Sequence, residues 1–156
     1  MKFKEEINPQ EAGLLRYRFA GPEDAKLLGS MNWQLIRDEG HRNSMTIEQL
    51  AERMAGWLRS EYRAVLFEDD DAVVGYALFR REPDYVYLRQ FFVRPEYRRK
   101  GIGRDSLRWL WANAWRDAPR LRIDVLTGNG TGHAFWQAVG FRDYCITMEM
   151  EHPHEP

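Results

Sequence analysis

The sequence predicts a mixed α/β domain of the α+β kind, in which a mostly antiparallel sheet is flanked by about four helices. Strand-like runs follow one another through short turns between residues 62 and 93, as in an antiparallel meander. Helical periodicity recurs on both sides of that block. A strand at 85–93, a long helix and a strand at 121–126 then form a crossover, which should place these two strands parallel and adjacent.

The N-terminal part predicts a strand followed by two helices. The run LLRYRF at 14–19 alternates enough to be a strand. A helix should begin at Pro22, since proline suits the first helical position, and should end near Gly40. The next helix should begin after Thr46, which forms a capping-box pair with Gln49. Apolar residues at helical spacing give these helices their buried faces: Leu28, Met31 and Leu35 in the first, and Ile47, Leu50, Met54, Trp57 and Leu58 in the second.

The long helix after residue 103 has a predicted buried face and ends before Pro119. The residues on that face are Leu107, Leu110, Trp111, Ala114 and Trp115. Trp109 falls off the face, so we expect it at the surface or at an interface. Exposure of Trp109, together with the aromatic residues of the last strands, favours a homodimer.

The C-terminal part predicts a short helix between two strands. A glycine-rich loop at 127–132 follows the 121–126 strand and leads into a helix at about 133–139. The loop does not have the Gly-x-Gly-x-x-Gly spacing of a dinucleotide site, and no Gly-Lys-Ser/Thr of a P-loop occurs in the chain. The segment 141–150 is the last expected strand, which completes the order β-α-α-β-β-β-α-β-α-β.

Composition indicates one globular domain over residues 13–151, with a polar lead-in at 1–12 and a loose tail at 152–156. The net charge of −1 argues against a general nucleic-acid or membrane surface. Cys145 is the only cysteine, so no internal disulfide forms, and a reducing, cytoplasmic location is expected. The chain shows no secretory signal and no apolar run long enough to cross a membrane. The acidic residues 68–71 suit a hairpin turn, so we expect no metal site there.

The basic turn before the long helix is the part of the chain that points to chemistry. A helix that begins near Gly101 and Gly103 leaves backbone N–H groups without intrahelical partners, and its dipole adds partial positive charge there. Three consecutive cations, residues 98–100, add full charge. The residues alone therefore predict an anion site for a phosphate or pyrophosphate, with a solvated basic turn as the alternative.

At this turn the sequence resembles the GNAT superfamily of N-acetyltransferases. The family's acyl-CoA motif, Arg/Gln-x-x-Gly-x-Gly/Ala, is matched by Arg98, Gly101 and Gly103. A second block is similar to the family's C-terminal signature: Asn129 lies seven residues before Trp136, and Gly140-Phe141 follows. The predicted order of strands and helices fits the family fold over residues 14–150, with the parallel strands splayed apart.

The resemblance implies which residues hold acetyl-CoA as co-substrate. The pyrophosphate would lie on the amides of residues 99–104, with Arg98 assisting. Main-chain groups of Phe92 and Val93 would pair with the pantetheine arm, and Asn129 would contact the same arm. The residues that the resemblance assigns to the cofactor are Phe92, Val93, Arg98, Arg99, Lys100, Gly101, Ile102, Gly103, Arg104, Asn129 and Trp136.

The chain departs from the family pattern at both usual acid/base positions. Many relatives have a tyrosine where this chain has Trp136, and an indole N–H is too weak an acid to protonate a thiolate. Many also have an acidic residue in the strand that enters the motif, where this chain has Arg89 and Gln90. Either other residues serve, or water relays the protons, or the domain binds acyl-CoA without efficient transfer. The candidate catalytic residues are Tyr144, Tyr87, His41 and Glu39.

The resemblance implies an N-acetyltransferase that transfers the acetyl group of acetyl-CoA to a primary amine by direct attack on the thioester. The alternative is an acyl-CoA-binding or regulatory domain with little or no catalysis. The acceptor would be a small molecule or a protein or peptide amine, bound between the 38–46 loop and the 82–85 turn. Acidic Asp38, Glu39 and Asp84 would suit a cationic amine there.

Overall fold

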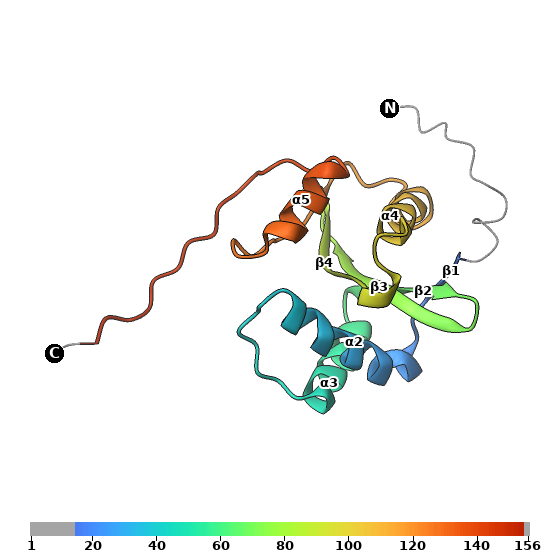
Figure 1. The fold of residues 1–156 in the computed structure, drawn as a ribbon, viewed down its shortest axis with the longest axis horizontal. Helices are drawn as coiled ribbons and strands as arrows, with labels where there is room; N and C mark the ends of the chain where they lie inside the picture. The colour runs from blue at the N-terminus through green and yellow to red at the C-terminus, as the bar shows by residue number, and fades with distance from the viewer. Residues whose placement is uncertain (1–14, 155–156) are drawn as a thin grey trace.

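The computed structural model describes residues 15–154 and has a five-stranded sheet in the order β1-β2-β3-β4-β5 (Figure 1). The strands are β1 (Leu15–Phe19), β2 (Tyr62–Asp69), β3 (Ala72–Arg81), β4 (Val86–Val93) and β5 (Leu121–Arg122). The first three pairings are antiparallel, and β4 pairs with β5 in parallel. The mixed, mostly antiparallel sheet is therefore confirmed, while the lead-in at 1–12 lies outside the described residues.

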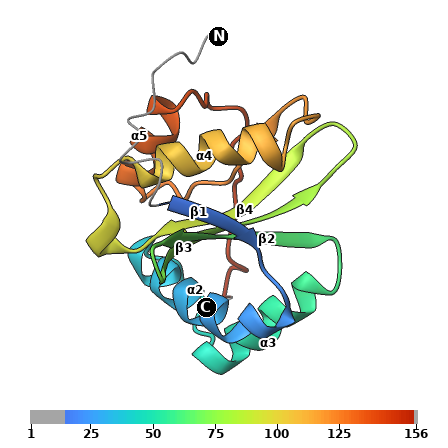
Figure 2. The ribbon, with the colours of Figure 1, turned by 90° about the vertical axis from the view of Figure 1, so that its right-hand side faces the viewer.

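Four α-helices lie on the two faces of the sheet in this part of the chain. They are α2 (Ala25–Asp38), α3 (Ile47–Leu58), α4 (Ile102–Asn113) and α5 (Gly130–Ala138), with short 3₁₀ turns η1 (Pro22–Asp24) and η2 (Pro95–Tyr97). Figure 2 shows α2 and α3 on one face, with α4 and α5 on the other. None of the helices among residues 15–154 has the length and apolarity needed to cross a membrane.

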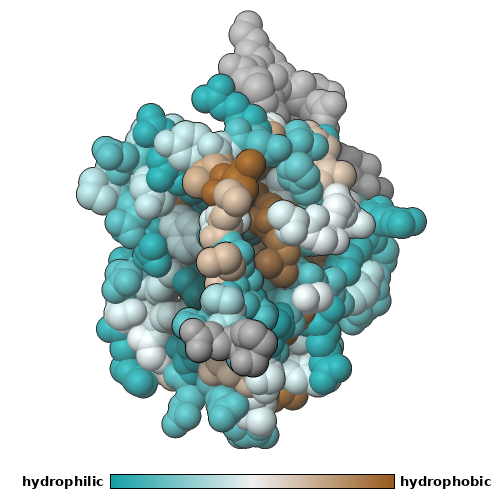
Figure 3. Space-filling view, turned by 90° about the vertical axis from the view of Figure 1, so that its left-hand side faces the viewer, coloured by the Kyte–Doolittle hydropathy of each residue, from teal (hydrophilic) through white to brown (hydrophobic). Residues whose placement is uncertain are grey.

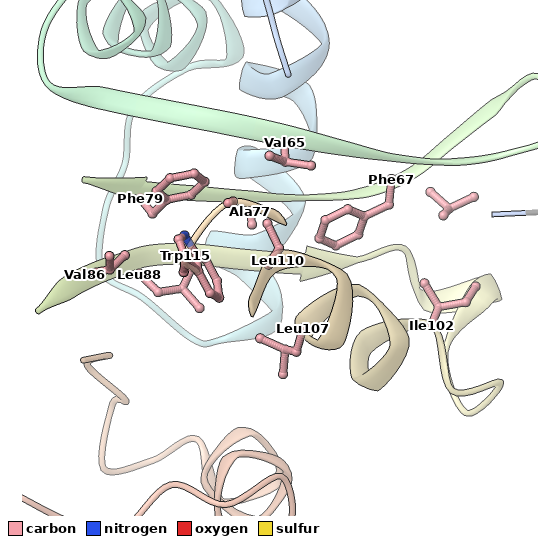
Figure 4. Close-up of a cluster of buried hydrophobic side chains, with 12 residues drawn as sticks. Val65, Phe67, Ala77, Phe79, Val86, Leu88, Ile102, Leu107, Leu110 and Trp115 are labelled. Carbon is pink, nitrogen blue, oxygen red and sulfur yellow. The ribbon is translucent and has the colours of Figure 1, made fainter. Parts of the chain in front are cut away.

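A separate apolar core fills each space between helices and sheet. Under α4 the core contains Leu107, Leu110 and Trp115 packed on β2, β3 and β4 (Figure 4). Under α2 and α3 it contains Leu28, Met31, Leu35 and Met54. Leu107 and Leu110 of α4 are three positions apart, and Leu28, Met31 and Leu35 of α2 are three and four apart, so each set lies on one buried face that holds its helix on the sheet.

The start of α3 follows the predicted capping box. The hydroxyl of Thr46 accepts the Gln49 N–H at 3.2 Å, and the Gln49 side chain accepts the Thr46 N–H at 2.9 Å. Two of the helix's unpaired amides are thereby satisfied. This fixes the point where the loop after α2 ends.

Two tryptophans of α4 differ in burial from what the sequence predicts: Trp109 is more buried than expected and Trp111 is more exposed. Trp109 is half-buried and stacks on Tyr17 of β1, with 4.6 Å between ring centroids. Trp111 was expected in the core but is 39% exposed, touching Trp115 edge-on. The cause is β1, which lies under the side of α4 that carries Trp109. Exposure of Trp109 therefore gives no support to a dimer.

The predicted strand at 141–150 is wrong as an element of this fold. These residues have no strand conformation, and Tyr144 is already 75% exposed. A strand exists only when a neighbouring strand pairs with it, and this segment instead extends away from the sheet without pairing (Figure 1). Its side chains still contact the rest of the protein, as Tyr144 does with Arg122 and Glu149 with Arg42, and apolar surface remains uncovered on this side of the molecule (Figure 3). The predicted 121–126 strand is likewise shorter, since β5 covers only Leu121–Arg122.

Candidate active site

The open side of β4 is the first feature of the site. β4 and β5 pair only at Val86 with Leu121 and at Tyr87 with Arg122, after which β5 ends. The remaining edge of β4, residues 88–93, therefore faces no paired strand in the described part of the chain. Such an edge presents backbone N–H and C=O groups to which an extended ligand can bond.

The basic turn lies at the end of this edge and has the conformation of an anion site. Arg99 and Gly101 both adopt left-handed backbone conformations, with φ of 63° and 79°. Gly101 is the N-cap of α4 and supplies no side-chain cap. Among the described residues, the amides of residues 99–104 have no backbone acceptor. Unpaired amides at a helix N-terminus, beside the exposed cations Arg99, Lys100 and Arg104, attract a phosphate group.

Arg98 is engaged with protein acceptors beside the turn. Its Nε donates to the Val93 carbonyl at 2.7 Å, and its Nη2 donates to the Asp38 carboxylate at 2.6 Å. The guanidinium also lies 5.6 Å from the centre of the Phe92 ring. Arg98 therefore joins the end of β4 to the C-terminal end of α2, and the cations that remain at the turn are its neighbours.

Helix α5 packs on β4 beside the open edge. Asn129 caps this helix, because its Oδ1 accepts the Gly132 N–H at 3.0 Å. Phe135 and Trp136 both pack on Phe91 of β4, with centroid separations of 6.3 and 5.3 Å. Phe135 also reaches the start of α4, where a Cβ added to Gly103 would lie 3.2 Å from its ring. The two sequence blocks of the resemblance therefore meet across Phe91.

A β-bulge in β4 determines which side chains face α2 and α3. Leu78 pairs with Gln90 and Phe79 with Leu88, so Arg89 is an extra residue in β4. The bulge turns both Arg89 and Gln90 toward the α2–α3 side. It places polar groups at the middle of the open edge.

Glu39, the C-cap of α2, is close enough to Tyr76 of β3 for its charge to affect that hydroxyl. The Tyr76 hydroxyl donates to the Gln90 side chain at 2.8 Å, and burial raises the pKa of Tyr76 well above its usual value. The nearby Glu39 carboxylate contributes to that shift. Burial, and then the charge of Asp38, raise the pKa of Glu39 itself. A half-buried carboxylate with a raised pKa is a suitable proton acceptor near neutral pH.

The other catalytic candidates lie apart from this group. Tyr87 stands where β4 and β5 diverge, and its hydroxyl donates to Asp124 at 2.6 Å. Burial, with the Asp124 contact, raises the pKa of Tyr87 and keeps its proton in place. His41 is exposed, and its Nδ1 accepts the Asn43 N–H at 3.2 Å. Tyr144 is exposed beside Arg122, at 3.4 Å between Nη2 and the hydroxyl.

The sequence did not indicate Tyr76, the turned Gln90 or the Asp124 partner of Tyr87. Tyr76 occupies an apolar-looking strand, and only the pairing of β3 with β4 reveals its polar neighbour. The extra residue at Arg89 has no local sequence signal. Each of these contacts depends on strands that come together in the folded chain.

Known proteins share the fold of this chain. The profile of the acetyltransferase (GNAT) family matches residues 30–141. A possible acetyltransferase from Clostridium difficile 630 superposes with a TM-score of 0.74 at 20% identity, covering 90% of this chain and 99% of that one. A predicted acetyltransferase with acetyl-CoA from Clostridium acetobutylicum gives 0.70 at 20% identity, with 90% and 100% covered.

The aminoglycoside N-acetyltransferase AAC(6')-Iy in complex with CoA is a further structure of this fold. Its TM-score is 0.72 at 13% identity, covering 88% of this chain and 94% of that one. At such identities the structural matches establish the fold. The profile match extends over most of the chain and includes the open edge of β4, the basic turn and α5. The chain therefore belongs to the GNAT family of acetyltransferases.

Proposed function

We propose that the protein is an acetyl-CoA-dependent N-acetyltransferase that acylates a primary amine of a small molecule, a protein or a peptide. The proposal rests on one observation, which is that two binding features of the structure adjoin each other at Val93. An open strand edge ends there, and a turn with unpaired amides begins a few residues later. An extended arm that ends in a pyrophosphate fits this combination.

The chain provides contacts along the whole length of such a ligand. Amides of residues 99–104, with Arg99 and Lys100, would hold the pyrophosphate. Main-chain groups at the end of β4, at Phe92 and Val93, would bond the arm beside the open edge. Trp136 of α5 packs on β4 beside this edge, and Asn129 is the N-cap of the same helix. When bound, acetyl-CoA supplies the activated acetyl group.

Glu39 is the residue that we assign as proton acceptor. An ammonium group has no lone pair, so the acceptor amine must lose a proton before it attacks a thioester. The Glu39 charge acts on Tyr76, whose hydroxyl donates to the Gln90 side chain at the middle of the open edge. The pKa of Glu39 is raised by burial and by Asp38, which makes its carboxylate a stronger base than that of an ordinary glutamate.

The proposal is tested by thioester consumption. Purified full-length protein is mixed with acetyl-CoA and a panel of primary amines, and the free CoA thiol is measured. We expect amine-dependent release of CoA above the rate of hydrolysis. Tight binding of CoA without turnover on any amine would instead support the acyl-CoA-binding alternative.

Replacing Trp136 with tyrosine should be tolerated and should raise the turnover number by up to about tenfold, because a phenol can protonate a departing thiolate and an indole cannot. Trp136→Phe is the matched control, since it keeps an aromatic ring on Phe91 without an acid. Steady-state kinetics with one amine checks both variants. A similar loss of rate in both would show that the indole itself is needed for packing.

A further inference from the structure

The guanidinium groups of two arginines contact the ring of one tryptophan beside the bulge of β4. The guanidinium carbon of Arg53 (α3) lies 4.4 Å from the centre of the Trp57 ring, and that of Arg89 lies 4.7 Å from it. Their charges repel each other, as the lowering of the Arg53 pKa by burial and by Arg89 indicates. Arg53 is partly buried and Arg89 is exposed, and a second positive charge beside a partly buried one is costly unless an anion joins them.

Among the described residues, no carboxylate forms an ion pair with either arginine. Arg53 donates from Nη2 to Asn32 Oδ1 at 3.0 Å, and Arg89 donates to the Tyr62 hydroxyl at 3.3 Å. The Nε of Arg53 is buried without a hydrogen-bond partner. Donors therefore remain unused on two guanidiniums whose planar geometry suits an oxyanion.

This pair lies on the acceptor side of the site. Arg89 directly precedes Gln90, the β4 residue bonded to Tyr76 in the group with Glu39. We infer that Arg53 and Arg89 form a subsite for a carboxylate carried by the acceptor, so that the acceptor is an amine with a carboxylate on the same molecule. The inference rests on the proposed function, and it reverses the expected preference for a purely cationic amine. Asp38 is one of the acidic residues on which that expectation was based, and it forms an ion pair with Arg98.

Direct binding tests the subsite independently of catalysis. Glycine, β-alanine and γ-aminobutyrate are each compared with the corresponding carboxamide by calorimetry on the CoA-saturated protein. At least one carboxylate should bind about tenfold or more tightly than its amide, because charge-assisted hydrogen bonds to arginine are strong. Arg53→Gln and Arg89→Gln should each remove most of that preference. Arg59→Gln, an exposed change at the end of α3, is the matched control and should retain it.

Each outcome decides the inference. Equal affinity for acids and amides, no binding of any acid, or a preference unchanged in both arginine variants would overturn it. Tighter binding of phosphoethanolamine than of every carboxylate would replace the carboxylate by a phosphate. Turnover of neutral amines without a preference for acids would overturn the subsite and leave the proposed function intact. A preference for acids without CoA release from any amine would retain the subsite and reject the transferase.

Discussion

Replacing Gly101 with aspartate is expected to weaken acetyl-CoA binding by about 100-fold or more, a change of roughly 3 kcal/mol. The first reason is charge, because the new carboxylate would lie at the start of α4, where the amides and cations attract a phosphate. The second is conformation, since Gly101 has a φ of 79°, which most side chains disfavour. Calorimetric titration with CoA measures the dissociation constant.

Gly101→Asn separates the two reasons. Asparagine tolerates the left-handed region better than most residues and carries no charge, so its affinity should lie between those of the wild type and the aspartate variant. Melting temperatures would show that all three proteins are folded. If the aspartate variant binds CoA as the wild type does, the pyrophosphate does not lie at this turn.

The turn could be predicted from sequence because its conformation is local. Gly101 and Gly103 permit the bend and the close approach of a ligand, and residues 98–100 supply charge within the same short stretch. The start of α3 at Thr46 was predictable for the same reason, since its capping box involves residues three positions apart. At both places, the contacts that determine the backbone conformation join residues close in the sequence, so sequence rules predicted the position correctly.

The polar side of β4 could not be predicted in this way. Whether Arg89 is an extra residue depends on how β3 and β4 come into register, and that register depends on both apolar cores. The bulge decides that Gln90 meets Tyr76 and that Arg89 meets Trp57. A pattern of alternation along one strand contains no information on such an insertion.

The last segment shows a second limit of sequence patterns. Alternation from Tyr144 to Met150 correctly identifies a chain suited to a sheet, yet it does not say which edge receives it. In the fold the segment passes β5 without pairing. The prediction for Trp109 was wrong for a related reason. The side of α4 that carries Trp109 is covered by β1, which is distant in the sequence.

Replacing Glu39 with glutamine should lower the turnover number by about 100-fold or more while leaving the dissociation constant of CoA unchanged, since general-base catalysis contributes about that much. The amide keeps the size of the side chain and removes its ability to accept a proton. Steady-state rates with a single amine measure the effect. Glu48→Gln, an exposed change in the first turn of α3, is the matched control and should have no effect.

The pH dependence gives the sharper form of this test. Glu39 can accept a proton only when it is ionised, so the rate should fall as the pH decreases through its pKa. Because burial and Asp38 raise that pKa, the fall should begin at a higher pH than for an ordinary glutamate.

Asp38→Asn removes the neighbouring charge and should move the fall to lower pH, and Glu39→Gln should abolish it. The asparagine variant also releases Arg98, so its CoA affinity must be measured alongside. If the Glu39→Gln variant keeps the wild-type rate and the same loss of rate at low pH, then water or another group accepts the proton.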